Sequence, residues 1–415
     1  MIPFYKPSIG EAEINEVVDC LRSGWLTTGP RAKQFEDEFA RYVGHAHAVA
    51  LNSCTAALHL ALEAIGLKAG QSVVVPTMTF AATAEVVRYF NATPLLADCR
   101  PEDLNLDVAD AARRIEAARA RGAEVAAIIP VHYGGQMGDV AGVVALARRH
   151  GLKIIEDAAH CCPAYYRDDS DSPWKTVGAE AAVSCFSFYA NKAITTGEGG
   201  MACTDSPELA DRMRLMSLHG ISRDAWKRYT AEGSWYYEIV APGYKYNLTD
   251  IAAAIGLHQL RKADLLHKKR TQWARLYSEL LGGMDELILP REMPDRIHSW
   301  HLYSIRLRLD RLDVDRAEVI SELKQAGIST SVHWMPLHLH PYYRESFGYE
   351  PSDFPCATAI YPELVTLPLY PDLTEEDVAV VCGTLKRIFA RARAVVPGAR
   401  VGAVVGENLC ENHAG

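Results

Sequence analysis

Seven short apolar runs alternate with helical patterns between residues 46 and 205, and this alternation limits the fold more than any other feature. The runs are AHAVALN, SVVVP, TPLLAD, VAAIIPV, KIIED, AAVSCFSF and GMACT. Segments with helical periodicity, such as TAALHLALEAIGL and DVAGVVALARRHGL, lie between several of them. Apolar strands separated by helices are typical of a largely parallel sheet that helices cover on both faces. We therefore predict an α/β fold whose ligands bind at the carboxyl ends of the strands.

The pattern changes in the C-terminal part of the chain. A long helical stretch begins near Thr249, and it is followed by the strand pattern HLYSIRLRL, the helix pattern DRAEVISELKQAG, the strand pattern STSVHW and a final helix over residues 375–392. This order predicts a smaller α+β domain. We expect a large domain over residues 1–265, a small domain over residues 266–392 and a flexible tail over residues 393–415, which has no clear period.

Composition excludes several classes of function. The formal net charge is −9, which argues against a nucleic-acid partner because such binding needs clustered Lys and Arg. None of the ten cysteines forms a CxxC pair, so we expect no metal site and a reducing compartment. The first residues lack the charged and apolar regions of a signal peptide, and no apolar run is long enough to cross a bilayer. We expect a cytoplasmic protein without a membrane partner.

Lys192 lies in FSFYANKAITTGEGG, between an aromatic strand pattern and a glycine-rich turn. A lysine that aromatic neighbours partly remove from water has a lowered pKa and becomes a usable nucleophile. The glycines allow the backbone to approach a ligand closely. The alternative is a solvated surface charge, which is the state of most lysines. The context favours a lysine that forms a Schiff base.

Two other segments place polar residues just past predicted strands. Asp157 ends the run KIIED, where a buried carboxylate is costly unless it meets a cation. It is either the counter-charge of a cationic ring nitrogen or part of a structural ion pair or helix cap, and His160 follows three residues later. Thr55 stands at the start of a helical pattern, where hydroxyls and N–H groups can bind a phosphate or cap an amphipathic helix.

Thr55, Asp157 and Lys192 together supply what pyridoxal phosphate requires. This cofactor needs a phosphate site, an acid at its ring nitrogen and a lysine for its aldehyde. Phe80, just past the run SVVVP, is a candidate for the flat group that packs on the ring, and the alternative is ordinary core packing. We therefore predict a pyridoxal-phosphate site at the carboxyl edge of the sheet.

Seven motifs occur in one order along the chain: SGWLTTGP, TAALHLAL, IIPVHYGGQMGD, IEDAAH, FSFYANKAITTGEGG, PGYKYNLTDIAAAIGLHQL and TLPLYPDLTEED. Together they resemble the DegT/StrS family of nucleotide-sugar aminotransferases, which are fold-type I pyridoxal-phosphate enzymes. The likeness covers about residues 3–390. It implies a mostly parallel seven-stranded sheet in a large domain, a smaller α+β C-terminal domain, and a homodimer with shared active sites.

The resemblance also implies a role for each candidate residue. Lys192 forms the Schiff base and then moves the proton, while Asp157 keeps the ring nitrogen protonated. Phe80 stacks on the ring. The remaining candidates are Cys54, Thr55 and Ser187 at the phosphate, His160 beside the cofactor, either Asn247 or Lys245 at the phosphate of the other subunit's cofactor, and His333 near the sugar.

The chain departs from the pattern of this family at two positions. Many relatives carry Gly where Cys54 stands, and many read GYNYR where this chain reads GYKYN. The forms GYKYN and EDAAH are most similar to the branch that makes UDP-4-amino-4-deoxy-L-arabinose. That branch carries Trp at the position of Phe80, so the identity of the sugar stays open.

The resemblance implies transamination of a nucleotide-linked 4-keto sugar to the 4-amino sugar. L-glutamate is the expected donor and 2-oxoglutarate the expected product, and the pathway makes cell-surface polysaccharide, lipopolysaccharide or antibiotic sugars. The alternatives are a pyridoxal-phosphate-binding sensor without turnover and an aminotransferase for a cyclitol ketone. Lys192 argues against a sugar 3-dehydratase, because those relatives carry His at this position.

Overall fold

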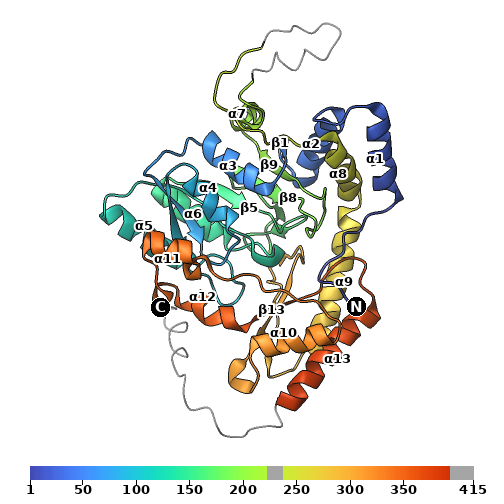
Figure 1. The fold of residues 1–415 in the computed structure, drawn as a ribbon. Helices are drawn as coiled ribbons and strands as arrows, with labels where there is room; N and C mark the ends of the chain where they lie inside the picture. Colours follow the sequence, from blue (N-terminus) through green and yellow to red (C-terminus); the bar gives the residue numbers. More distant parts are fainter. Residues whose placement is uncertain (222–236, 393–415) are drawn as a thin grey trace.

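A seven-stranded sheet lies at the centre of the molecule (Figure 1), and its strands follow the order β1-β9-β8-β5-β4-β2-β3. The computed structural model describes residues 1–221 and 237–392. Strand β9 runs antiparallel to both of its neighbours, and the other neighbouring pairs are parallel. The strands are β1 (His47–Leu51), β2 (Ser72–Pro76), β3 (Thr93–Ala97), β4 (Val125–Ile128), β5 (Lys153–Asp157), β8 (Val183–Ser187) and β9 (Gly200–Thr204).

Each of the seven apolar runs contains one strand of this sheet, so the predicted α/β class and the mostly parallel sheet are confirmed. Every residue of β2 and β9 is buried, because both faces of the sheet are covered. Parallel strands end at the same edge of a sheet. Asp157 ends β5 and Ser187 ends the neighbouring β8, so both residues lie at that edge.

Helices pack on the two faces of the sheet. Alternate residues of β1 show the two sides: Val49 and Leu51 face one apolar cluster, while Ala48 and Ala50 face another. The first face is covered by α3 (Cys54–Ala64), α4 (Ala82–Arg88) and α7 (Pro207–Ser217). The opposite face is covered by α2 (Pro30–Val43), α5 (Val108–Ala120), α6 (Val140–His150) and α8 (Asp250–Arg261), and α1 (Glu11–Ser23) packs on α8.

Helix α3 corrects one expectation. The sequence predicts an amphipathic helix after Ser53, but residues 56–62 are all buried. The reason is that α3 is enclosed by the sheet on one side and by α4 and α7 on the others. A helix that is apolar all round is an interior helix.

The C-terminal part forms a second, antiparallel sheet of three strands, which lies below the large sheet in Figure 1. Its strands are β10 (Leu287–Ile288), β12 (Tyr303–Leu307) and β13 (Leu364–Leu367). The long α9 (Ala263–Leu281) leads to it, and the other helices are α10 (Arg316–Gln325), α11 (Pro341–Phe347), α12 (Pro355–Ile360) and α13 (Glu375–Ala392). A small third sheet holds β6 (Tyr165–Tyr166), β7 (Lys175–Thr176) and β11 (Arg296–Ile297).

The predicted elements of this part are mostly confirmed. HLYSIRLRL contains β12, DRAEVISELKQAG contains α10, and the final helix covers residues 375–392. The strand expected at STSVHW is wrong. Ser331 makes a single bridge to Thr366 of β13, and the chain then turns away from the sheet, so no ladder forms.

Apolar contacts divide the C-terminal part between two cores. One cluster joins Ile2 to residues between 274 and 392, including α10 and α13. Leu337, Tyr343 and Phe354 instead pack with the cluster of α3 and the large sheet. The predicted boundary at residue 265 falls in the first turn of α9 and stays a prediction, while the expected tail over residues 393–415 lies outside the described residues. Among the described helices, none has the length and apolarity needed to cross a membrane.

Candidate active site

A cavity of about 450 Å³ opens at the carboxyl ends of β5 and β8. Most of the predicted site residues line it, although they come from segments far apart in the sequence. These residues are Cys54, Thr55, Phe80, Asp157, His160, Ser187, Lys192 and His333. The position agrees with the rule that open α/β sheets bind ligands beyond the carboxyl ends of their strands.

Lys192 lies in the loop that joins β8 to β9 and reaches the cavity. Its backbone N–H donates to the carbonyl of Tyr189, which closes the loop. Burial lowers the pKa of Lys192 to about 8, while the nearby Cys54 and Asp157 oppose this shift. An amine with this pKa is neutral in a large share of molecules near pH 8, as a nucleophile requires.

Asp157 is buried at the end of β5 and also lines the cavity. Its Oδ2 accepts a hydrogen bond from Thr83 Oγ1 at 2.7 Å, and its Oδ1 accepts one from the backbone N–H of Ala159 at 3.2 Å. Burial raises the pKa of Asp157, and these two hydrogen bonds together with the charge of Lys192 oppose the rise. A carboxylate in this setting favours a cationic partner, such as a protonated ring nitrogen.

The N-terminus of α3 forms another part of the cavity wall. Ser53 caps the helix, because its Oγ accepts a hydrogen bond from the N–H of Ala56 at 3.1 Å, so the capping interpretation is confirmed. Cys54 and Thr55 occupy the first turn, whose N–H groups have no partner within the helix and can point to an anion. The cap and an anion-binding role are compatible, since they use different N–H groups.

Gly200 explains how β9 approaches this helix end. A Cβ atom on Gly200 would lie 2.3 Å from Ser53 C and 2.5 Å from Cys54 N, closer than any real contact. Only glycine therefore lets the start of β9 pack directly on the first turn of α3. Neighbouring Gly199 lines the cavity.

Phe80 and Ser187 both line this cavity. The Phe80 side chain is 61% exposed, which is unusual for a large apolar group and leaves a ring face available for stacking. This exposure argues against the alternative that Phe80 is ordinary core packing. Ser187 is partly buried, and its Oγ accepts a weak hydrogen bond from the N–H of Tyr189 at 3.4 Å.

Aromatic side chains form another part of the cavity wall. His160 stacks on Trp334, with ring centroids 5.0 Å apart, and its ring lies 4.2 Å from that of His301. His333 Nδ1 is 2.9 Å from Thr366 Oγ1. Burial lowers the pKa of all three histidines, to about 4 for His333, so they are neutral near pH 7. Among the described residues that line the cavity, Lys192 is therefore the single side chain with a positive charge near neutral pH.

Lys245 and Asn247 do not line the cavity of their own chain. Lys245 Nζ donates to Asn247 Oδ1 at 2.6 Å, and Asn247 Nδ2 donates to Thr28 Oγ1 at 2.6 Å. Backbone contacts attach this segment to the end of β1, because Asn52 N–H donates to the carbonyl of Tyr246. Their predicted contact with the other subunit's cofactor stays a prediction.

Three residues of the site were missed by the sequence analysis. Thr83 holds Asp157, and His301 and Trp334 complete the aromatic wall. Trp334 directly follows His333, so adjacency could have suggested it. Thr83 and His301 lie in ordinary helix and strand patterns, and no local signal separates them from core residues.

One cluster of possible metal ligands exists among the described residues. It comprises Asp98, Cys99 and Cys356, all buried. The Asp98 carboxylate accepts hydrogen bonds from the N–H groups of Cys99, Cys356 and Ala357, so it holds the start of α12. The expected absence of a metal stays a prediction.

The residues present fit pyridoxal phosphate. The cavity offers an anion site at α3, a buried acid at Asp157 and an amine of lowered pKa at Lys192. The exposed ring of Phe80 at the cavity provides a flat surface for the cofactor ring. These groups match the needs of this cofactor in type and arrangement.

Comparisons with known proteins agree with this geometry. The DegT/DnrJ/EryC1/StrS aminotransferase family matches residues 7–386. The spore coat polysaccharide biosynthesis protein SpsC of Bacillus subtilis is 44% identical over 392 residues, which are 94% of this chain and 98% of that protein. The uncharacterized protein MJ1066 of Methanocaldococcus jannaschii is 45% identical over 392 residues, with the same coverage.

A solved structure shows the same similarity in three dimensions. The putative sugar aminotransferase Spr1654 of Streptococcus pneumoniae, in its PMP-form, superposes with a TM-score of 0.85 at 32% identity, covering 94% of this chain and 100% of that one. The same protein is also solved in its PLP-form. With the matched site, this assigns the chain to the DegT/DnrJ/EryC1/StrS aminotransferase family, as a pyridoxal-phosphate-dependent aminotransferase.

Proposed function

We propose that this enzyme transfers an amino group from L-glutamate to the C4 ketone of a nucleotide-linked sugar. The observation that supports it best is the cavity itself, where the amine of Lys192 and the carboxylates of Asp157 and Glu198 share the lining with mostly uncharged polar and aromatic side chains. Such a wall suits the hydroxyls and C–H faces of a sugar. The names of SpsC and Spr1654, which refer to polysaccharide biosynthesis and sugar amination, point in the same direction.

The shortage of positive charge supports a second part of the proposal, a homodimer with shared sites. A nucleotide diphosphate and the carboxylates of glutamate need cations, yet Lys192 is the single cation among the described residues of the cavity. Lys245 lies outside the cavity of its own chain and is exposed. A second copy that presents Lys245 and Asn247 would supply the missing charge and hydrogen-bond donors.

The chain's own residues divide the work of the proposed reaction. When bound, pyridoxal phosphate carries the amino group from donor to ketone and withdraws electrons from the reacting carbon. The first turn of α3 would hold the phosphate, and Asp157 would keep a proton at the ring nitrogen. Phe80 would pack on the ring.

Lys192 performs the proton transfers. Its Nζ takes the proton from the carbon that carries the donor's amino group. In the second half of the reaction it delivers a proton to C4 of the acceptor sugar. Burial favours the neutral form that this requires, since it lowers the pKa of Lys192 to about 8. The hydrogen bonds from Thr83 and Ala159 favour the ionised form of Asp157, which would keep the ring nitrogen protonated.

A panel of ketones tests the acceptor. The purified protein in its pyridoxamine form is mixed with UDP-, dTDP- and GDP-linked 4-keto sugars and with a cyclitol ketone, and the aminated product is identified by mass spectrometry. We expect amination of one nucleotide sugar at C4. Amination of the cyclitol alone would contradict the proposed acceptor.

The donor is tested separately. We expect L-glutamate to yield 2-oxoglutarate in repeated turnovers when the acceptor is present. The Lys192→Ala protein is the control and should give none. A wild-type protein that binds the cofactor but forms no 2-oxoglutarate with any accepted ketone would contradict glutamate as donor.

A further inference from the structure

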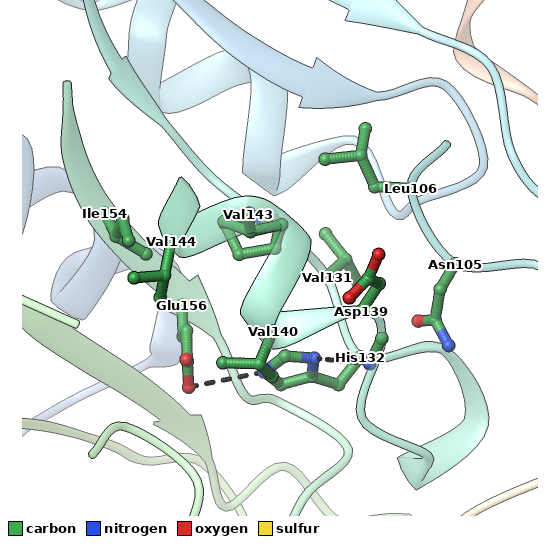
Figure 2. A pocket seen from close by; sticks show the side chains of 12 residues that line it. Asn105, Leu106, Val131, His132, Asp139, Val140, Val143, Val144, Ile154 and Glu156 are labelled. Carbon is green, nitrogen blue, oxygen red and sulfur yellow. Dashed lines mark hydrogen bonds and ion pairs between the residues drawn. The ribbon is translucent and has the colours of Figure 1, made fainter. Parts of the chain in front are cut away.

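A buried polar pair lies directly behind Asp157, on the other face of the sheet. His132 Nε2 is 3.3 Å from Glu156 Oε2, and both side chains are almost completely buried (Figure 2). Apolar residues of β5 and α6, including Val143 and Val144, surround the pair. Burial of charged side chains in such apolar surroundings costs free energy unless the charges are paired. A buried pair of this kind therefore suggests a structural role for its contacts.

One hydrogen bond of the His132 ring, at Nδ1, indicates which ring nitrogen faces Glu156 with its proton. The N–H of Gly138 donates to His132 Nδ1 at 3.3 Å, so a neutral His132 carries its proton on Nε2, the atom that faces Glu156. The loop that contains Gly138 continues into α6, whose N-cap is Asp139. His132 thus connects Glu156 to the fixed start of a helix.

Glu156 has a second anchor. Its Oε2 accepts a hydrogen bond from the N–H of Gly178 at 2.7 Å. Glu156 and Asp157 are consecutive residues of β5, so their side chains point to opposite faces of the sheet. An anchored Glu156 therefore prevents rotation of the strand end that presents Asp157 to the cavity.

The backbone of the His132 segment holds Asp157 directly. The N–H of Asp157 donates to the carbonyl of Pro130 at 3.0 Å, and the N–H of His132 donates to the carbonyl of Asp157 at 3.3 Å. The end of β5 is thus held by the segment that follows β4, and the side chain of His132 in that segment lies 3.3 Å from Glu156 Oε2. No contact of the pair reaches the cavity, because neither residue lines it.

We propose that His132 and Glu156 are positioning residues that fix the carboxylate of Asp157 against the cofactor's ring nitrogen. The inference rests on the proposed role of Asp157. It goes beyond that role, because it assigns a function to two residues that touch neither cofactor nor substrate. Breaking the pair should leave the cavity intact but let the carboxylate of Asp157 move away from the ring nitrogen. That nitrogen should then be unprotonated in a fraction of the molecules.

The test uses the enzyme loaded with pyridoxal phosphate that carries ¹⁵N in its ring. The ¹⁵N chemical shift reports protonation of that nitrogen without any turnover. Two variants break the pair: Glu156→Leu removes the carboxylate oxygen that contacts both His132 Nε2 and the N–H of Gly178, and His132→Phe removes both ring nitrogens. Val143→Ala, which lines the same small cavity without a polar contact, is the matched control for loss of packing.

We expect both pair variants to move the ¹⁵N shift toward the unprotonated value and to lower kcat by roughly 10- to 100-fold. Val143→Ala should lower the melting temperature and leave the ¹⁵N shift at the wild-type value. A wild-type shift in Glu156→Leu or His132→Phe would overturn the proposal, and so would an equal change in Val143→Ala. Failure of every sugar to react would contradict the proposed function instead, and the ¹⁵N result would still stand.

Discussion

At the scale of single residues, burial shifts the two key groups of the cavity in opposite directions. It lowers the pKa of Lys192 to about 8 and raises the pKa of Asp157, because a low dielectric disfavours both charged forms. Perturbed groups that share one cavity are typical of catalytic sites. Each group therefore depends on a few named neighbours for its protonation state.

The lowered pKa of Lys192 predicts how the apo-protein takes up its cofactor. Only the neutral amine attacks an aldehyde, so the rate constant for attachment should rise between pH 7 and pH 8 and level off above pH 9. The measurement is stopped-flow absorbance after mixing apo-protein with pyridoxal phosphate. A rate that keeps rising toward pH 10, as expected for the ordinary lysine pKa of 10.5, would contradict the buried setting of this amine.

The hydrogen bond from Thr83 to Asp157 predicts how the activity falls at acidic pH. Thr83→Val removes the O–H that donates to Asp157 Oδ2, and this hydrogen bond favours the ionised carboxylate. The pKa of Asp157 should therefore rise further in this variant. Because activity requires the ionised carboxylate, acidification should abolish the activity of the variant at a higher pH than that of the wild type. We also expect kcat/KM at pH 7 to fall about tenfold, the equivalent of ~1.5 kcal/mol for a hydrogen bond to a charged group.

Thr83→Ser is the matched control, since it keeps the hydroxyl and loses a methyl group. Its pH profile should follow the wild type. An acid limb that stays in place in Thr83→Val, or moves equally in Thr83→Ser, would show that the hydroxyl does not control Asp157.

At the scale of secondary-structure elements, the phosphate site depends on how closely β9 packs on the start of α3. Gly200→Ala places a Cβ against backbone atoms of Ser53 and Cys54, which cannot move aside as a side chain can. Overpacking of this kind costs about 1–3 kcal/mol. We expect the affinity for pyridoxal phosphate to fall roughly tenfold or more, because the strain falls on the N–H groups that bind its phosphate.

Equilibrium titration of the apo-protein with pyridoxal phosphate measures this loss. Gly383→Ala in α13 is the control, because a Cβ there meets nothing closer than Arg387 Nη1 at 3.6 Å. That variant should bind the cofactor normally. Equal affinities in the two variants would mean that the start of α3 does not hold the phosphate.

Element patterns also show which parts of the fold a sequence can predict. Strands β2, β5 and β9 coincide with the runs SVVVP, KIIED and GMACT, because a strand buried on both faces is apolar from end to end. STSVHW has a similar local pattern but forms no strand, since only Ser331 makes a backbone bridge to β13, while His333 and Trp334 line the cavity. That outcome depends on tertiary contacts, which a local pattern does not contain.

At the scale of the whole molecule, the site is assembled from distant parts of the chain. Asp157 ends β5 and Lys192 follows the adjacent β8, and the sequence alone predicts that both lie at the carboxyl edge of the sheet. His301 and Trp334 reach them only because the C-terminal part folds back onto the large sheet. The N-terminal arm joins the same wall, since Phe4 stacks on His333 with ring centroids 5.6 Å apart. The N-terminal arm and the C-terminal part therefore both contribute to the cavity wall.

The proposed shared sites predict recovery of activity in mixed dimers. Lys192→Ala disables the site of its own chain, and a double variant, Lys245→Ala with Asn247→Ala, disables the site of its partner. Subunits exchanged between the two inactive proteins should recover about a quarter of wild-type activity, because half of the dimers are mixed and each mixed dimer holds one intact site. No recovery after confirmed exchange would contradict a contribution from the second copy.

The central claim is that Lys192 is the residue that bonds to pyridoxal phosphate. Borohydride reduction of the loaded enzyme fixes that bond, and peptide mapping by mass spectrometry locates it. The label is expected on the peptide that contains Lys192 and on no other. A label on a different lysine, or no label on protein saturated with the cofactor, would contradict the account.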